Sequence, residues 1–125
     1  MTIPNTPTVP YSVFVARLAK PGADIIATLT PSKAHLLHMA VGISGEAGEL
    51  LDAIKKHVVY NKPLDEDNVV EELGDLMFYM QGMMNELSLH PAGVEFQNKQ
   101  KLMKRYKSAM YSDKAAQDRE DKEPT

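Results

Sequence analysis

Two long stretches of this 125-residue chain repeat apolar residues at helical spacing, and this periodicity limits the fold more than any other feature. Thr30-Pro31 is a helix start signal, because threonine caps helix N-termini and proline is tolerated at the first helical position. We expect that helix to reach about residue 57. Asp65 is the expected N-cap of a second helix that reaches about residue 87. The apolar stripes, spaced by three and four residues, comprise Leu36, Ala40, Ile43, Ala47, Leu50 and Ile54 in the first stretch and Val69, Leu73, Leu76, Met80, Met83 and Leu87 in the second.

The remaining segments add shorter helices. Residues 11–20 are a helix candidate that Pro21-Gly22 ends, and residues 22–29 add a turn or two. A further helix is expected from about residue 92 to residue 110. No segment alternates polar and apolar residues as a half-buried strand would. The sequence therefore predicts an all-α fold, an antiparallel bundle of about four to five helices that occupies residues 11–111.

The terminal segments and the overall composition bear on the location of the protein and on its partners. Residues 1–10 contain three prolines and are expected to be an extended lead-in, and the charged residues 112–125 a frayed or disordered tail. The net charge is −3, which argues against a nucleic-acid partner. The chain has no cysteine, so disulfides and thiolate ligands are excluded. No apolar run approaches the roughly 18 residues of a membrane span. We expect a soluble, cytoplasmic protein.

Two pairs of carboxylates flank the apolar stripes on the same rotational side. Glu46 lies about 80° and Glu49 about 140° around the first helix from its stripe. Glu72 lies about 60° and Asp75 about 120° around the second. Helices joined by a short connection run antiparallel, and both cross-pairs are then centred on the same point near Tyr60. We therefore expect Glu49 to lie level with Glu72 and Glu46 level with Asp75.

Four carboxylates in one small volume require raised pKa values or a counter-ion. Hard divalent cations such as Mg²⁺ bind oxygen ligands of this kind, together with water and phosphate. Acidic pairs at this spacing are common on solvated helix faces, but two pairs at matched depth favour a site. Glu71 and Asp52 point away from it and are expected to be solvated, whereas Tyr79 shares the carboxylate flank. Gly42 and Gly45 lie near that flank and are expected to leave room for an ion or a ligand.

These motifs resemble a known family. The segments "GISGEAGELLDAIKK" and "EELGDLMFY" are similar to the MazG-like nucleoside triphosphate pyrophosphohydrolases of the all-α NTP pyrophosphatase superfamily, whose hallmark is E-x-x-E, a variable spacer and E-x-x-D. The two motifs here are Glu46/Glu49 and Glu72/Asp75, with 22 residues between them. "NKQKLMKRYKSAMYS" resembles the third-helix segment of the family. The resemblance extends over about residues 30–122 and is closest to short, single-domain members, including phage-encoded ones.

The resemblance implies hydrolysis of a nucleoside triphosphate between its α- and β-phosphates, giving the monophosphate and pyrophosphate. It assigns the four carboxylates as catalytic ligands of Mg²⁺, with Mn²⁺ as a substitute, and one glutamate as a candidate general base. The third-helix motif supplies four substrate-binding candidates, and the region of the connection between the long helices supplies one lysine. Two further candidates, a tyrosine and a histidine, lie on or near the carboxylate flank. The substrate-binding candidates are Asn98, Lys101, Arg105, Tyr106, Lys56, Tyr79 and His35.

Some features depart from the family pattern or leave alternatives open. The chain has no tryptophan for base stacking, so the base stays unassigned; Tyr79, Phe78, Tyr11 and Phe14 are the candidate substitutes. Lys107 stands where the family usually has proline. The helix of residues 65–87 has a second apolar face, and members of the family form dimers or tetramers, so we expect a homodimer or homotetramer. The expected ligand is a nucleoside triphosphate, and no nucleic acid or membrane is expected as a partner. The alternative function is a catalytically silent helical interaction module that uses the acidic patch to bind metal or a partner.

Overall fold

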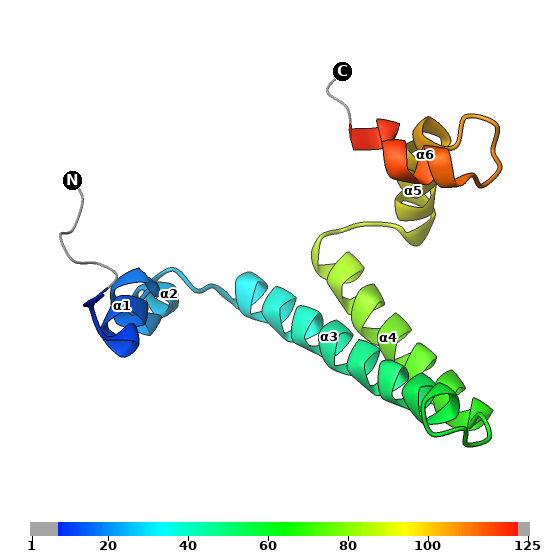
Figure 1. Cartoon of the computed structure of the whole chain (residues 1–125). Helices are drawn as coiled ribbons and strands as arrows, with labels where there is room; N and C mark the ends of the chain where they lie inside the picture. The colour runs from blue at the N-terminus through cyan, green and yellow to red at the C-terminus, as the bar shows by residue number, and fades with distance from the viewer. Residues whose placement is uncertain (1–7, 123–125) are drawn as a thin grey trace. The chain divides into compact units, whose positions relative to one another are not determined.

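The computed structural model describes residues 8–122, which contain helices, turns and loops and no strand (Figure 1). The all-α prediction is therefore confirmed for this part of the chain. Most of the expected lead-in and the last three residues lie outside the described range. Within it, no helix is both long and apolar enough to cross a membrane. The elements are α1 (Tyr11–Leu18), α2 (Gly22–Ala27), α3 (Pro31–Val58), α4 (Glu66–Glu86), α5 (Pro91–Arg105), α6 (Asp113–Asp118) and the 3₁₀ turn η2 (Glu120–Lys122).

The chain divides into two compact units, residues 1–34 and residues 35–125. The described part of the first unit contains the short helices α1 and α2, each preceded by a proline at its N-cap. The rings of Tyr11 and Phe14 stack on each other within α1, with centroids 6.4 Å apart. The domain predicted over residues 11–111 spans the boundary between the units and stays a prediction.

The starts of the two long helices are set by the caps that the sequence indicates. The Thr30 hydroxyl accepts a hydrogen bond from the Lys33 backbone N–H at 3.1 Å, at the start of α3. The Asp65 carboxylate accepts one from the Asn68 backbone N–H at 3.1 Å, at the start of α4. Each cap satisfies a backbone donor that the first helical turn leaves without an internal partner.

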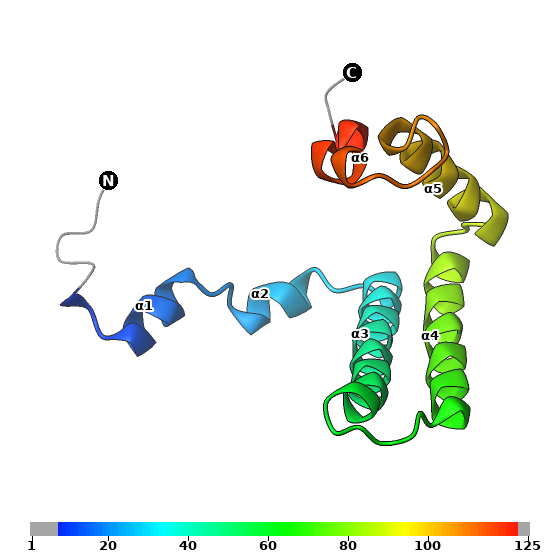
Figure 2. The same cartoon turned by 45° about the vertical axis from the view of Figure 1, so that its right-hand side comes forward.

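Helices α3 and α4 lie side by side and antiparallel (Figures 1 and 2). Two glycines set their close approach, one in each helix. A Cβ atom at Gly42 would clash with the Tyr79 ring from α4, and one at Gly82 would clash with the Met39 sulfur from α3. Each helix thus accommodates a large side chain of the other against bare backbone.

The seam between α3 and α4 is rotated from the predicted apolar stripes toward the carboxylates. Met39 and Ala53 are the buried hydrophobic residues of the described chain, 5% and 9% exposed, and neither belongs to a predicted stripe. The prediction was wrong for half of the stripe positions, because the glycine contacts fix a different rotation. The stripe residues that are exposed in the structure are Ala40, Ala47, Ile54, Leu73, Met80 and Leu87.

Helix α5 ends at Arg105, before the expected end near residue 110. Its start follows from His90, whose Nδ1 accepts a hydrogen bond from the Ala92 backbone N–H at 3.1 Å, with Pro91 at the first helical turn. The chain then leaves the helix, and Ala109 adopts a left-handed backbone conformation with φ 58°. Helix α5 thus ends at Arg105 although Lys107, and not proline, follows Tyr106.

The segment after α5 forms α6 and η2 over residues 113–122, an order that composition alone does not indicate, since it favours a frayed or disordered tail at residues 112–125. The Ser112 hydroxyl caps α6 by accepting a hydrogen bond from the Ala115 backbone N–H at 3.1 Å. Both α6 and η2 contact α5. Local propensity could not predict this order, because the contacts link residues far apart in sequence.

Candidate functional site

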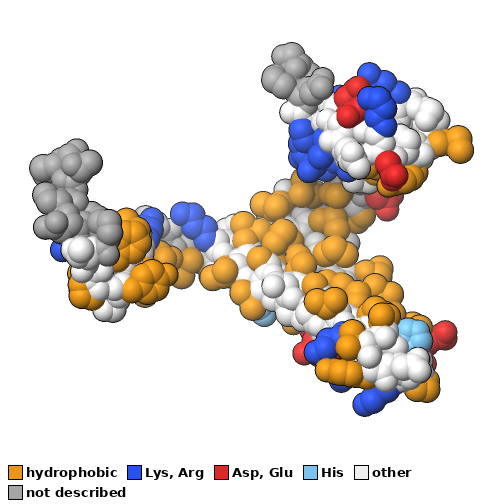
Figure 3. All heavy atoms as spheres, viewed as in Figure 1, with side chains coloured by type: hydrophobic (Ala, Val, Ile, Leu, Met, Phe, Trp, Pro, Cys, Tyr) orange, Lys and Arg blue, Asp and Glu red, His pale blue; other side chains and the backbone are white. Residues whose placement is uncertain are grey.

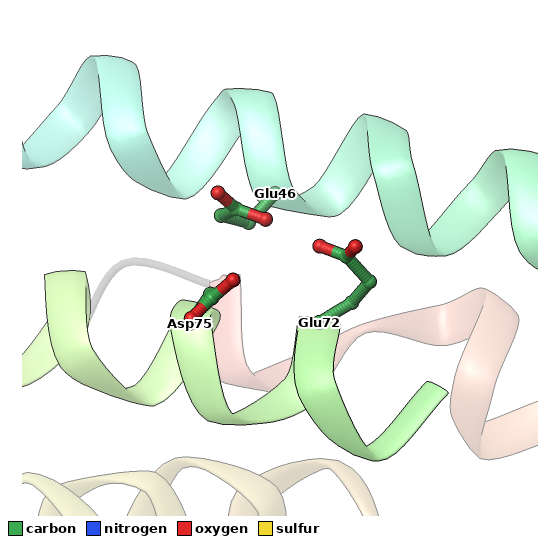
Figure 4. Close-up of side chains that lie close together, drawn as sticks. All are labelled: Glu46, Glu72 and Asp75. Carbon is green, nitrogen blue, oxygen red and sulfur yellow. The ribbon is translucent and has the colours of Figure 1, made fainter. Parts of the chain in front are cut away.

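Three carboxylates from the two long helices converge between α3 and α4 (Figure 4). Glu46 projects from α3, and Glu72 and Asp75 project from α4 toward it. One oxygen atom can be chosen from each so that all three lie within 4.8 Å of one another. Glu46 is half-buried, Glu72 is buried and Asp75 is exposed. The helical pitch brings Glu72 and Asp75 to one face because they are three residues apart.

The Glu72 carboxyl has the most perturbed environment of the three. Its pKa is raised from 4.5 to about 7. The largest cause is a side-chain hydrogen bond with Glu46, which requires a proton on one of the two carboxyls. Burial adds to the rise, and so do the negative charges of Glu46, Glu49 and Asp75. Without a cation, the site therefore favours the protonated form of Glu72.

The arrangement fits a divalent cation. Glu72 Oε2 is buried and has no hydrogen-bond partner among the described residues. A buried oxygen that lacks a donor is costly unless something binds it. Its neighbours are further carboxylate oxygens, which are the ligands that hard cations such as Mg²⁺ prefer. A bound divalent cation would satisfy the oxygen and offset the mutual repulsion of the carboxylates.

Glu49 lies at the edge of this group. It is exposed and does not belong to the three carboxylates that meet within 4.8 Å. Its charge nevertheless helps to raise the pKa of Glu72. We expected Glu49 to lie level with Glu72, whereas the carboxylate of α3 that joins Glu72 and Asp75 in the group of three is that of Glu46. The rotated seam explains the difference, because it moves Glu46 toward α4.

The two acidic residues expected to lie outside the site do so. Glu71 is exposed. Asp52 binds Lys56 one turn further along α3, with Nζ and Oδ2 2.9 Å apart. This contact raises the pKa of Lys56, and the charge of Glu49 raises it slightly more. Lys56 also lines a hollow of about 320 Å³ beside the α3–α4 connection, together with Lys62.

An aromatic cluster lies next to the carboxylates, along the helical hairpin that α3 and α4 form. Tyr79 lies one turn beyond Asp75 and packs edge-on against Phe78, with ring centroids 5.3 Å apart. Its other neighbour is His38, at 6.1 Å. The space at Gly42 that was expected to admit an ion or ligand is filled by the Tyr79 ring.

Sequence reasoning favoured His35 over His38 as the histidine near the site, whereas the structure places His38 against Tyr79. His35 is exposed. The signal for His38 was present in the spacing, since His38, Gly42 and Glu46 follow one another at four-residue intervals on one side of α3.

Alanine at Gly42 should distort the hairpin. Its Cβ would overlap the Tyr79 ring, and overpacking of this kind costs roughly 1–3 kcal/mol. Gly48 provides the matched control in the same helix, because a Cβ there meets no atom within 4 Å. Gly48→Ala should stabilise the protein by about 1 kcal/mol through helix propensity alone. Urea unfolding of both variants measures the contrast, and equal stabilisation by the two would show that Tyr79 does not pack on Gly42.

The predicted substrate-binding residues of α5 differ in environment. Asn98 and Lys101 are exposed, whereas Arg105 and Tyr106 are half-buried. Arg105 makes a two-pronged ion pair with Asp121, with Nε to Oδ1 at 2.8 Å and Nη2 to Oδ2 at 3.2 Å. The contact raises the pKa of Arg105 further and lowers that of Asp121. Two of the donor positions that a phosphate would use are thus occupied by the chain's own carboxylate.

A comparison with protein families finds a match. The family model described as the MazG nucleotide pyrophosphohydrolase domain matches residues 35–109, a span that contains α4 and α5 and nearly all of α3. No curated protein and no solved structure matches the chain.

Proposed function

The chain belongs to the MazG nucleotide pyrophosphohydrolase family, and on that premise we propose that it hydrolyses nucleoside or deoxynucleoside triphosphates at the α–β phosphate bond in the presence of Mg²⁺. The products would be the nucleoside monophosphate and pyrophosphate. The observation that carries the proposal is the buried Glu72, whose raised pKa and unpartnered Oε2 are the features expected of a cation ligand without its cation. Family membership supports the reaction class, and the carboxylate group supports the cation.

The metal ligands in this proposal are Glu46, Glu49, Glu72 and Asp75. Bound Mg²⁺, for which Mn²⁺ can substitute, would neutralise phosphate charge and lower the pKa of a water molecule. Glu46 and Glu72 hold their carboxyls toward each other from opposite helices and so define where the cation would lie. Because water must lose a proton as it attacks, one of the three glutamates also serves as the base.

The substrate contacts in the proposal come from two groups of residues. Lysine and arginine side chains bind the phosphates through charge-assisted hydrogen bonds, and Arg105 can do so with two parallel bonds. Polar and aromatic side chains bind the sugar and base, where rings offer stacking surfaces. The proposed phosphate ligands are Lys56, Lys101 and Arg105, and the proposed nucleoside contacts are His35, His38, Tyr79, Asn98 and Tyr106.

A panel of ribonucleoside and deoxyribonucleoside triphosphates tests the activity. Each is incubated with the protein in Mg²⁺ or in EDTA, and pyrophosphate release is measured. We expect release from at least one nucleotide in Mg²⁺ and none in EDTA. If no member of the panel releases pyrophosphate, the enzyme proposal fails, and a helical interaction module that uses the acidic patch becomes the better account.

We further propose that the hairpin of α3 and α4 is completed by a second copy of the chain. Hydrophobic side chains gather on the exposed surface of both helices (Figure 3). Leu37 and Val41 on α3 are 62% and 61% exposed, and Val70 and Met77 on α4 are 68% and 66% exposed. Apolar surface of this kind, in a chain whose described part buries two hydrophobic residues, is typical of a subunit interface.

Light scattering should therefore find a dimer or a tetramer at micromolar concentration. Met77→Asp should shift the protein toward the monomer, because an interface would have to bury the new charge. A wild-type protein that is monomeric at this concentration would contradict the proposed assembly.

A further inference from the structure

The C-terminal residues Glu120 and Asp121 bind the basic end of α5. Five of the chain's 14 lysines and arginines lie in the nine residues 99–107. Asp121 binds Arg105 with two parallel bonds, and its side chain is 0% exposed while that of Arg105 is 17% exposed. Next to it, Lys107 Nζ lies 2.6 Å from Glu120 Oε2.

The geometry of the Arg105–Asp121 pair is also the geometry by which arginine binds phosphate. A guanidinium presents parallel donors that match either a carboxylate or a phosphate. A polyphosphate and Asp121 therefore compete for the same Nε and Nη2 atoms. Since the Asp121 side chain is fully covered, the polyphosphate gains those atoms only when η2 moves away from α5.

We propose that Glu120 and Asp121 form an internal competitor for polyphosphate at the basic end of α5, so that this segment lowers the affinity of the resting protein for its substrate. The inference rests on the proposed function for the identity of the substrate. The apparent affinity of a ligand falls by the fraction of protein in the competent state. A closed segment thus weakens binding without altering any other residue of the site.

The alternative is that Asp121 positions Arg105 for substrate, and the two accounts predict opposite signs. If the segment competes, loss of the Asp121 charge strengthens polyphosphate binding. If it positions Arg105, the same change weakens binding. A matched control lies in the same region, because Asp118 makes a one-turn ion pair with Lys114, at 2.6 Å, and does not bind Arg105.

The test measures binding of inorganic tripolyphosphate to the full chain by calorimetry in EDTA, so that it depends on neither metal nor turnover. Asp121→Asn should bind about tenfold more tightly than wild type, and Asp118→Asn should bind as wild type does. Arg105→Gln, added to Asp121→Asn, should remove the gain. A second variant, shortened so that it ends at Arg119, should also bind more tightly than wild type, because it lacks Glu120 and Asp121 whether or not α6 still folds.

Equal or weaker binding by both Asp121→Asn and the shortened chain would overturn the inference. Because the titration is metal-free, its result is separate from the hydrolase assay. Tighter binding without any pyrophosphate release would sustain the competitor and reject the proposed function. Pyrophosphate release by a protein whose tripolyphosphate binding is unchanged in both variants would support the proposed function and reject the competitor.

Discussion

Glu72→Gln should abolish pyrophosphate release and, at the same time, make the metal-free protein more stable at pH 8. At that pH the Glu72 carboxyl, with its pKa of about 7, is ionised among three other carboxylates. Glutamine has almost the same shape and carries no charge, so the repulsion and the cost of burying a charge are removed. The same substitution removes a proposed cation ligand, for which we expect a loss of activity of at least about 100-fold.

The neighbouring residue supplies the control for this prediction. Glu71→Gln removes one negative charge from the same turn of α4, but Glu71 is exposed and lies outside the carboxylate group. It should change neither activity nor stability appreciably. Thermal unfolding in EDTA and pyrophosphate release in Mg²⁺ measure the two effects. A Glu72→Gln variant that is less stable than wild type at pH 8, or that keeps near-wild-type activity, would refute the assignment of Glu72.

The stability of the metal-free protein should fall as pH rises from about 5 to about 7. In this range Glu72 loses its proton in the unfolded chain, where its pKa is near 4.5, but keeps it in the folded chain, where its pKa is about 7. The folded state then binds more protons than the unfolded state, so the free energy of unfolding decreases with pH and levels off above pH 7. Asp52 and Asp121 have lowered pKa values and act in the opposite sense, but at more acidic pH.

Added Mg²⁺ should reverse this loss. At pH 8 the free energy of unfolding should rise by about 2.7 kcal/mol when the free ion is at about 100 times its dissociation constant. At pH 5 the gain should be much smaller, because protons compete with the ion for Glu72. Urea unfolding at pH 5, 6, 7 and 8, with Mg²⁺ or EDTA, measures both effects. Subtracting the free energies of unfolding of Glu72→Gln from those of the wild type isolates the contribution of Glu72. A gain from Mg²⁺ that is equal at pH 5 and pH 8 would exclude Glu72 as a ligand.

Features that depend on a few neighbouring residues were predictable from the sequence. The starts of α3 and α4 follow from Thr30 and Asp65, whose side chains cap the backbone three residues on. The convergence of Glu46 with Glu72 and Asp75 was also predictable, because helical pitch and an antiparallel connection place them at similar depth.

Features that depend on distant contacts were not predictable. The rotation of the α3–α4 seam follows from the fit of Tyr79 against Gly42 and of Met39 against Gly82, and hydrophobic periodicity does not report such fits. The order of residues 113–122 accompanies a contact between Arg105 and Asp121, 16 residues apart in sequence. Composition indicates only that this segment is charged, and charge alone favours disorder.

The most direct test of the central claim is the identity of the products. A nucleoside triphosphate from the reactive members of the panel is incubated with the protein in Mg²⁺, and the phosphorus NMR spectrum is followed with time. The account predicts equal amounts of nucleoside monophosphate and pyrophosphate, and no reaction in EDTA or with Glu72→Gln. Formation of nucleoside diphosphate and orthophosphate, or consumption of the nucleotide at the same rate by Glu72→Gln, would contradict it.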